Sequence, residues 1–387
     1  MSGRRDWGLA LVVAGALGVA ACGPSGIRIA TTAIPTLSRT TGSFDDMAID
    51  QGTHRMFVAD RSDQGVDVFD ISTATARYVQ TIPIPSSPNG LAIAPDLERI
   101  FVGTSSGSVA VADISTNSPT TNNVIDVVQT GGRQADLLDY SAERHRVYAS
   151  NRADGTITSI DSETHEIRAH FDVGHPLEQP RYDPADGMVY VTSPDADALF
   201  RIDPNDGSIK SSALGGCVPT GMAINPKSNH ALIACKSFVM SWDLASGKSE
   251  VFGQVAGGDV VSYYSGADRF LVASPLGTGH SVIGIFGGTP IAYLSTVVTD
   301  ARGKSAAYDE TNHVIYTPDG RAGRAGIASF RAPAIPPPWL SFVTDFGPLV
   351  AILAVMGLVI YVVARSADPV RRRDPARQPV PRVLRPR

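Results

Sequence analysis

The residues best suited to chemistry in this sequence are acidic pairs in short polar segments. Asp195 and Asp197 are two positions apart, and two carboxylates at that spacing can do acid–base work or hold a cation. An aspartate in a short loop more often caps a turn through its own backbone, and we prefer that interpretation. The sequence contains no G-x-S-x-G, H-E-x-x-H, P-loop or EF-hand pattern. It therefore predicts no catalytic residue, no metal site and no cofactor-binding residue.

A repeat of about 43 residues supplies the strands that must position these polar residues. One column of the repeat lies in a short apolar run and contains Phe57, Phe101, Tyr148, Tyr190, Leu232, Leu271 and Tyr316. Successive members of this column are 44, 47, 42, 42, 39 and 45 residues apart. Each apolar run has a small apolar strand before it and an alternating strand after it. Four strands in a repeat of this length are typical of a β-propeller blade, so seven copies predict seven blades.

The units resemble the YVTN type of β-propeller repeat. In that family a (R)VYVT(N) strand is followed by a glycine-containing turn and a strand that ends in Ile-Asp. Residues 144–161 and 186–203 match best, with R-V-Y-A-S-N at 146–151 and M-V-Y-V-T-S at 188–193. The resemblance covers about 27–331 and implies an all-β fold, a seven-bladed β-propeller. Relatives of this repeat type include lactonase-like hydrolases and quinone-cofactor dehydrogenases.

The seventh copy stops after its third strand, near Phe330, whereas an apolar strand, Ile27 to Ile34, precedes the first copy. We expect this N-terminal strand to be the outer strand of blade seven, which closes the ring and leaves no open edge. Strand directions alternate, so Ile27 and Arg331 should lie at one end of the ring, the bottom face. The loops that enter each first strand and leave each second strand form the opposite, top face.

Propellers usually bind their ligands and partners at the top face. The candidate binding residues in its loops are Asp60, Arg61, Asp63, Arg152, Asp154, His175, Glu178, Asp195, Asp197, Lys236, His280, Asp319 and Arg321. Four histidines fall instead in turns at the bottom face: His54, His145, His230 and His313. They are about a blade apart, so we interpret them as turn residues, with contact to lipid headgroups as the alternative.

Two of the three cysteines fall in blade five. Cys217 enters the first strand and Cys235 ends the second. In an antiparallel pair both lie at the top edge of neighbouring strands, which is within reach of a disulfide outside the cytoplasm. Two small buried thiols are the alternative. Neither cysteine belongs to a C-x-x-C-H motif, which excludes covalent c-type haem.

Residues 1–21 are expected to be a signal peptide of the lipoprotein type. An arginine pair precedes the short apolar stretch Leu9–Ala21. The sequence V-A-A-C at 19–22 resembles a bacterial lipobox, and this resemblance implies cleavage before Cys22 and a diacylglyceryl group on its sulfur. An ordinary signal peptide, or an uncleaved anchor, is the alternative.

After the propeller, 22–331, the sequence predicts a proline-rich linker at 332–340 and a transmembrane helix at 341–365. Residues 346–364 contain no charged side chain, and a helix of that length spans roughly 28 Å, close to the hydrocarbon thickness of a bilayer. Three arginines follow at 371–373, so the positive-inside rule places the basic tail, 366–387, in the cytoplasm. A buried core helix is the alternative.

The net charge of −5 is unevenly distributed: 365–387 carries +6 and 1–21 carries +1, which leaves −12 for the residues between them. An acidic body does not suit nucleic-acid binding. The sequence therefore predicts a membrane-anchored extracytoplasmic β-propeller, in the periplasm at the cytoplasmic (inner) membrane. It would act as a protein-binding or scaffolding subunit of a membrane complex, with protein and membrane lipid as partners.

A propeller enzyme, lactonase-like hydrolase or quinone-cofactor dehydrogenase, is the alternative function. It requires polar side chains that converge on the central channel. Three or more inward carboxylate, histidine or arginine side chains at the top of the channel would favour it. Passive envelope structure is a third possibility.

Overall fold

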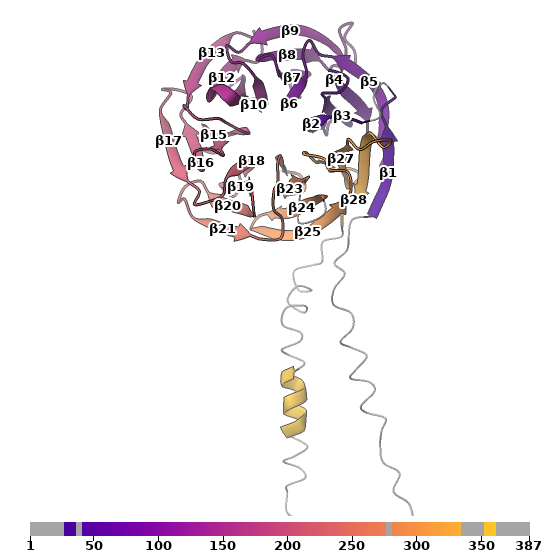
Figure 1. Cartoon of the computed structure of the whole chain (residues 1–387), viewed down its shortest axis with the longest axis vertical. Helices are drawn as coiled ribbons and strands as arrows, with labels where there is room; N and C mark the ends of the chain where they lie inside the picture. The colour runs from indigo at the N-terminus through magenta and orange to yellow at the C-terminus, as the bar shows by residue number, and fades with distance from the viewer. Residues whose placement is uncertain (1–26, 36–40, 276–280, 334–351, 361–387) are drawn as a thin grey trace, which may run out of the picture. The chain divides into compact units, whose positions relative to one another are not determined.

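The computed structural model describes residues 27–35, 41–275, 281–333 and 352–360. The chain divides into two compact units, Met1–Ala334 and Ile335–Arg387. In the described part of the first unit, seven four-stranded antiparallel sheets are arranged in a ring (Figure 1). The predicted all-β, seven-bladed propeller is confirmed.

Each blade has four strands, numbered here from the axis of the ring outward. The innermost strands are β2 (Phe44–Asp50), β6 (Pro88–Ala94), β10 (Ala135–Ser141), β14 (Pro180–Asp183), β18 (Pro219–Asn225), β22 (Val261–Tyr264) and β26 (Ala307–Asp309). The second strands are β3 (Arg55–Asp60), β7 (Arg99–Thr104), β11 (Arg146–Asn151), β15 (Met188–Ser193), β19 (His230–Cys235), β23 (Arg269–Ser274) and β27 (Val314–Asp319).

The third strands are β4 (Gly65–Asp70), β8 (Ser108–Asp113), β12 (Thr156–Asp161), β16 (Ala198–Ile202), β20 (Val239–Asp243), β24 (Ser281–Gly288) and β28 (Gly326–Arg331). The outer strands are β5 (Arg77–Pro83), β9 (Asn123–Gln129), β13 (Ile167–Asp172), β17 (Ile209–Ala213), β21 (Ser249–Phe252), β25 (Ile291–Thr299) and β1 (Ile27–Ala33). A short 3₁₀ helix, η1 (Arg152–Asp154), follows β11.

The repeat column of aromatic and leucine residues forms the centre of the core. All seven members lie in second strands, and their side chains are at most 2 % exposed. A second strand has a neighbour on each side in its own sheet and another blade against each face. It therefore reads as a continuous apolar run rather than as an alternating one. The outer strands β9 and β13 have several exposed residues instead.

The N-terminal strand closes the ring as expected. β1 pairs antiparallel with β28, with Ile27 opposite Arg331 and Ala33 opposite Gly326 (Figure 1). Towards the axis, Arg331 pairs with Val314 on β27, and Val314 pairs with Asp309 on β26. Ile27, Arg331 and the end of the innermost strand β26 therefore lie at one end of blade seven, the bottom face.

Of the predicted end segments, only 332–333 and 352–360 are described, and the second of these is helical. The signal peptide, Cys22, the basic tail and most of the predicted span 341–365 lie outside the described residues. Within the described ranges, none of the helices combines the length and apolar character that crossing a membrane requires.

Candidate functional site

The first polar feature of the central channel is a ring of seven residues at the top of the innermost strands. Its members stand twelve residues before each member of the repeat column, and they are Asp45, Asn89, Asp136, Glu178, Thr220, Asp259 and Lys304. We call this set the upper ring. The charges of Asp45, Asp136 and Asp259 all act on the carboxyl of Glu178. Side chains from blades one, three, four and six thus converge at the top of the channel.

Arginine and lysine side chains connect the upper ring across blade boundaries. Arg152, after the second strand of blade three, lies 2.6 Å from Glu178 and 3.6 Å from Asp136. Lys304 lies 3.6 Å from Asp259 and 3.8 Å from Asp45. These two cations hold all four carboxylates of the ring in ion pairs.

A third cation, Arg61, joins blade one to blade two. It pairs with Asp45 and donates to the side-chain oxygen of Asn89 at 2.7 Å. Counting Arg61, three cations face four carboxylates, so the group is close to neutral overall.

Burial shifts the titration of this group. It raises the pKa of Glu178 to about 7, although the Arg152 charge acts in the opposite direction. Burial also raises the pKa of Asp136 and of Asp259, against the charges of Arg152 and Lys304 respectively. The upper ring therefore contains a carboxyl that exchanges a proton near neutral pH.

Two side chains, one from Gln179 just before β14 and one from Arg181 in β14, cross the channel below the upper ring. Gln179 donates to the Val261 carbonyl at 3.2 Å, and its own oxygen accepts the Val261 and Met222 N–H groups at 3.2 and 2.9 Å. Arg181 donates to the same Val261 carbonyl at 3.3 Å. Val261 belongs to blade six, two blades away, so Gln179 and Arg181 separate the upper ring from the space beneath.

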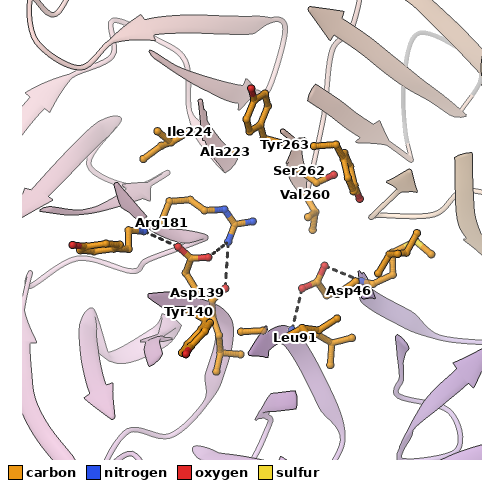
Figure 2. Close-up of a pocket in the computed structure, with 18 of the residues that line it drawn as sticks. Asp46, Leu91, Asp139, Tyr140, Arg181, Ala223, Ile224, Val260, Ser262 and Tyr263 are labelled. Atoms are coloured by element: carbon orange, nitrogen blue, oxygen red, sulfur yellow. Dashed lines mark hydrogen bonds and ion pairs between the residues drawn. The ribbon is translucent and has the colours of Figure 1, made fainter. Parts of the chain in front are cut away.

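That space is a cavity of about 460 Å³, lined by the innermost strands of blades one to six (Figure 2). We call it the lower cavity. Its walls are mostly apolar or aromatic, with Ile49, Ile93, Tyr140, Ile224, Tyr263 and Tyr264 among them. These residues lie near the bottom ends of their strands, so the cavity faces the end of the ring where Ile27 and Arg331 lie.

Three charged side chains line the lower cavity: Asp46, Asp139 and Arg181 (Figure 2). Asp139 accepts the Tyr182 N–H at 2.7 Å and lies 3.6 Å from Arg181. Asp46 lies across the cavity from them and accepts the N–H groups of Met47 and Leu91 at 2.8 and 3.0 Å. Burial raises the pKa of Asp46 to about 7 and also raises the pKa of Asp139.

The structure gathers three of the residues predicted for the top face, Arg61, Arg152 and Glu178, around the channel. Asp319 and Arg321 form a separate ion pair in blade seven, with side-chain atoms 2.8 Å apart. These five residues are therefore divided between two sites.

Two other predicted residues, Asp60 and Asp154, hold loops of the propeller. The fully buried Asp60 accepts the Ser62 N–H at 2.7 Å, and Asp63 is half-buried in the same hairpin. The side chain of Asp154 pairs with Arg133 at 2.7 Å. These contacts favour a structural role over ligand binding.

Asp195 and Asp197 do not act as a pair. Asp197 accepts the N–H groups of Gly216 and Val218, at 2.5 and 2.7 Å, and thereby holds the turn before β18. Asp195 is exposed in the hairpin between β15 and β16. Asp197 therefore has a structural role, but it holds a neighbouring loop rather than its own turn, and the acid–base alternative has no geometric support.

His175 stacks on Phe200, with ring centres 5.9 Å apart, and Lys236 is exposed after β19. His280 lies outside the described residues.

Cys217 and Cys235 are joined by a disulfide, with Cα atoms 4.8 Å apart. Within the described ranges, no three His, Cys, Asp or Glu side chains are placed to hold a metal ion.

Sequence reasoning missed most of the channel. It did not single out Asp45, Asp136, Asp259 or Lys304 in the upper ring, nor the lower-cavity residues Asp46, Asp139 and Arg181. The upper ring has a readable signal, because it keeps a constant offset from the repeat column. The lower cavity has a weaker signal: β2 and β10 each contain a further aspartate, Asp46 and Asp139, besides the upper-ring aspartate.

A scan against protein-family models finds no match for this chain, and a search of curated proteins finds no relative. The functional argument therefore rests on the geometry of the propeller itself.

Proposed function

We propose that this protein is a non-catalytic scaffolding subunit that binds a protein partner, within a membrane complex, through its top face. The observation that carries the proposal is the pairing of Ile27 with Arg331 at the bottom of blade seven. The chain on both sides of the propeller continues from those two residues. Both ends of the described propeller therefore lie at the bottom face, and we infer that the top face is the surface used by a partner. Fold alone does not set function, so this surface is what has to be tested.

We also propose that both flanking segments anchor the propeller to the inner membrane, on its periplasmic side. A diacylglyceryl group on Cys22 and a spanning helix at 341–365 are the two anchors, with 366–387 in the cytoplasm. Support comes from 352–360, which is helical and carries large apolar side chains that are more than half exposed in this chain. One acyl chain binds a bilayer reversibly, whereas a spanning helix makes attachment permanent.

The proposed role of the upper ring is to keep the top face rigid. Its four carboxylates are neutralised by Arg152, Lys304 and Arg61 across blade boundaries. A buried ion pair adds little net stability, but removal of one partner is strongly destabilising. Such a ring fixes the relative positions of the blades, which a docking platform needs.

The experiment is gentle solubilisation of the full-length chain, capture by a C-terminal tag and mass spectrometry of what accompanies it. A partner in fixed stoichiometry is the expected result. If the chain is recovered alone from its native membrane, the scaffold proposal fails.

Blade five supplies a matched pair of variants for this experiment. Lys236 and Lys227 are both exposed and flank the same strand, β19, at its top and bottom ends. Lys236→Glu is expected to weaken partner recovery, because it reverses a charge on the proposed binding face. Lys227→Glu makes the same chemical change at the bottom face and should leave recovery unchanged.

A hydrolase of the lactonase-like class is the second candidate function. The specific observation in its favour is that Asp136, Glu178 and Arg152 converge at the top of the channel. The buried Glu178 carboxyl, with its pKa raised to about 7, is suited to general acid–base work. The resemblance of the repeats to the YVTN type, which we retain as part of this proposal, points to the same class.

Lactone hydrolysis by the full-length chain, assayed with and without added divalent metals, tests this candidate. Activity that disappears in Glu178→Gln but persists in the exposed-residue control Glu250→Gln supports an enzyme. Lack of turnover in the wild-type chain across a panel of lactones removes the candidate.

A further inference from the structure

Asp46 is the one charged group of the lower cavity that has no ion-pair partner among the described residues. Its two oxygens accept backbone N–H groups from Met47 and Leu91, which leaves lone pairs on both oxygens free. The side chain is buried and points into the cavity (Figure 2). An ionised carboxylate in such a place is costly unless it takes up a proton or a cation approaches it.

The charge of the nearby Arg181 acts on Asp46, but no hydrogen bond or ion pair joins the two described side chains. Arg181 donates to the carbonyls of Pro180, Leu138 and Val261 at 3.1, 3.2 and 3.3 Å, and it lies 3.6 Å from the Asp139 carboxylate. The direct contacts of the Arg181 guanidinium are therefore with these carbonyls and with Asp139, and not with Asp46. The same contacts exclude an anionic ligand, since Arg181 is already surrounded by acceptors. With both carboxylates ionised, the cavity has an excess of one negative charge.

The cavity walls suit an organic cation rather than a bare metal ion. Tyr140, Tyr263 and Tyr264 line the cavity together with isoleucine side chains, and tyrosine rings attract ammonium groups through their faces. The charge of Asp46 acts on the Tyr264 hydroxyl, so this ring lies close to the free carboxylate. A volume of about 460 Å³ is within the usual range for small-molecule sites.

We propose that the lower cavity is a binding site for a small organic ammonium ion, with its charge against Asp46 and its apolar body against the tyrosine and isoleucine walls. This site is separate from the top face and independent of the scaffold role. The ammonium group can belong to a soluble alkyl- or arylalkylamine or to an ethanolamine headgroup. Both have the same chemistry, and the cavity faces the end of the propeller where Ile27 and Arg331 lie.

Binding should depend on pH. The charged and titratable groups around Asp46 are Asp45 on its own strand, Asp139 on β10, Arg181 on β14 and Tyr264 on β22. In the empty cavity burial raises the pKa of Asp46 to about 7. An ammonium ion needs the ionised carboxylate, so it lowers that pKa on binding. The affinity for the ammonium ion should therefore rise with pH between 6 and 8. It should level off above the pKa that Asp46 has without ligand.

The experiment is isothermal titration of the full-length chain at pH 8 with 2-phenylethylammonium. 2-Phenylethanol is the neutral probe and 3-phenylpropionate the anionic probe. The proposal expects binding of the ammonium alone and a loss of about tenfold or more in Asp46→Asn, which keeps the side-chain size but removes the charge. Glu250→Gln, on the exposed outer strand β21, removes a carboxylate elsewhere and should bind like the wild type.

The outcomes are decisive even if Asp46→Asn folds poorly. In the wild-type chain, equal affinity for the three probes, or an affinity that does not weaken from pH 8 to pH 6, overturns the proposal. So does a lack of ammonium binding at millimolar concentration. Titration with glycerophosphoethanolamine then separates the two sources: tighter binding than that of 2-phenylethylammonium indicates a headgroup, and weaker binding indicates a soluble amine.

Discussion

The carboxylate of Glu178 lies 2.6 Å from the guanidinium of Arg152, and this contact joins blade four to blade three. Arg152 also reaches Asp136, 3.6 Å away, so one cation serves two buried carboxylates. Strand pairing stays within each blade, and among the described residues isolated backbone hydrogen bonds cross to the next blade, such as those from the Gly221 N–H to the Asp259 carbonyl and from the Val260 N–H to the Lys304 carbonyl. Contacts of this kind, together with apolar packing, are what hold neighbouring blades in register.

Removing Arg152 should destabilise the propeller. Arg152→Ala leaves Glu178 and Asp136 buried without their counter-ion, and we expect a loss of about 1–2 kcal/mol in the free energy of unfolding. This magnitude allows for the solvent exposure of Arg152 itself, 47 % of its side chain. Denaturant unfolding followed by tryptophan fluorescence measures it.

Arg133 provides the control for that variant. It forms an ion pair of similar length with Asp154, 2.7 Å, but 76 % of its side chain is exposed. Arg133→Ala should cost less than about 0.5 kcal/mol. Equal losses in the two variants would show that burial of the carboxylates contributes nothing.

The buried carboxyl of Glu178 should also make stability depend on pH. Its pKa is raised from 4.5 to about 7 in the folded chain, so the folded state binds more protons than the unfolded state between those values. Its contribution to stability is therefore complete below about pH 4.5 and is lost as the pH rises towards 7. Carboxylates with lowered pKa values, such as Asp161 at about 2, act below this window.

Unfolding free energies measured at pH 5, 6, 7 and 8 test this contribution. Glu178→Gln cannot titrate, so its stability should fall less than that of the wild type between pH 5 and pH 8. Glu250→Gln, on the exposed strand β21, should follow the wild-type curve. A parallel curve for Glu178→Gln would mean that this group does not titrate in the window.

Much of the architecture could be predicted because each blade repeats one local pattern. The column from Phe57 to Tyr316 marks the buried second strands, and an incomplete seventh copy predicts closure by the N-terminal strand. Both inferences need only contacts within a blade or between chain ends. The positions of the upper ring could also have been predicted from the sequence. Each member lies twelve residues before a member of the repeat column, as Asp45 does before Phe57 and Glu178 before Tyr190.

The rest depends on contacts that have no local pattern. Gln179 and Arg181 cross from blade four to Val261 in blade six, and no repeat spacing predicts which side chain spans the axis. The unpaired state of Asp46 is likewise a property of its neighbours from other blades. Some of the loop residues that sequence reasoning chose have structural contacts instead: Asp60 holds its own turn and Asp197 holds a neighbouring loop.

The disulfide of blade five should contribute measurably to stability. It closes a loop of 18 residues between Cys217 and Cys235, both fully buried. In the chain-entropy account a loop of this size is worth about 3 kcal/mol. The double variant Cys217→Ala/Cys235→Ala is expected to lose about 2–4 kcal/mol in the free energy of unfolding, measured with denaturant. In the wild type, reductant should lower the stability only slowly, because the buried disulfide must first become exposed.

The closing strand of blade seven gives the sharpest test of the fold. A Cβ added at Gly326 would lie 2.2 Å from the Thr32 carbonyl on β1, so Gly326→Ala must push the two strands apart. We expect a loss of about 2 kcal/mol, in the range for overpacking, and faster proteolysis near residue 33. Gly253→Ala is the control, because a Cβ there meets nothing within 4 Å. If both variants keep wild-type stability and protease resistance, β1 does not close the ring in solution, and the proposal that both flanking segments leave the bottom face loses its basis.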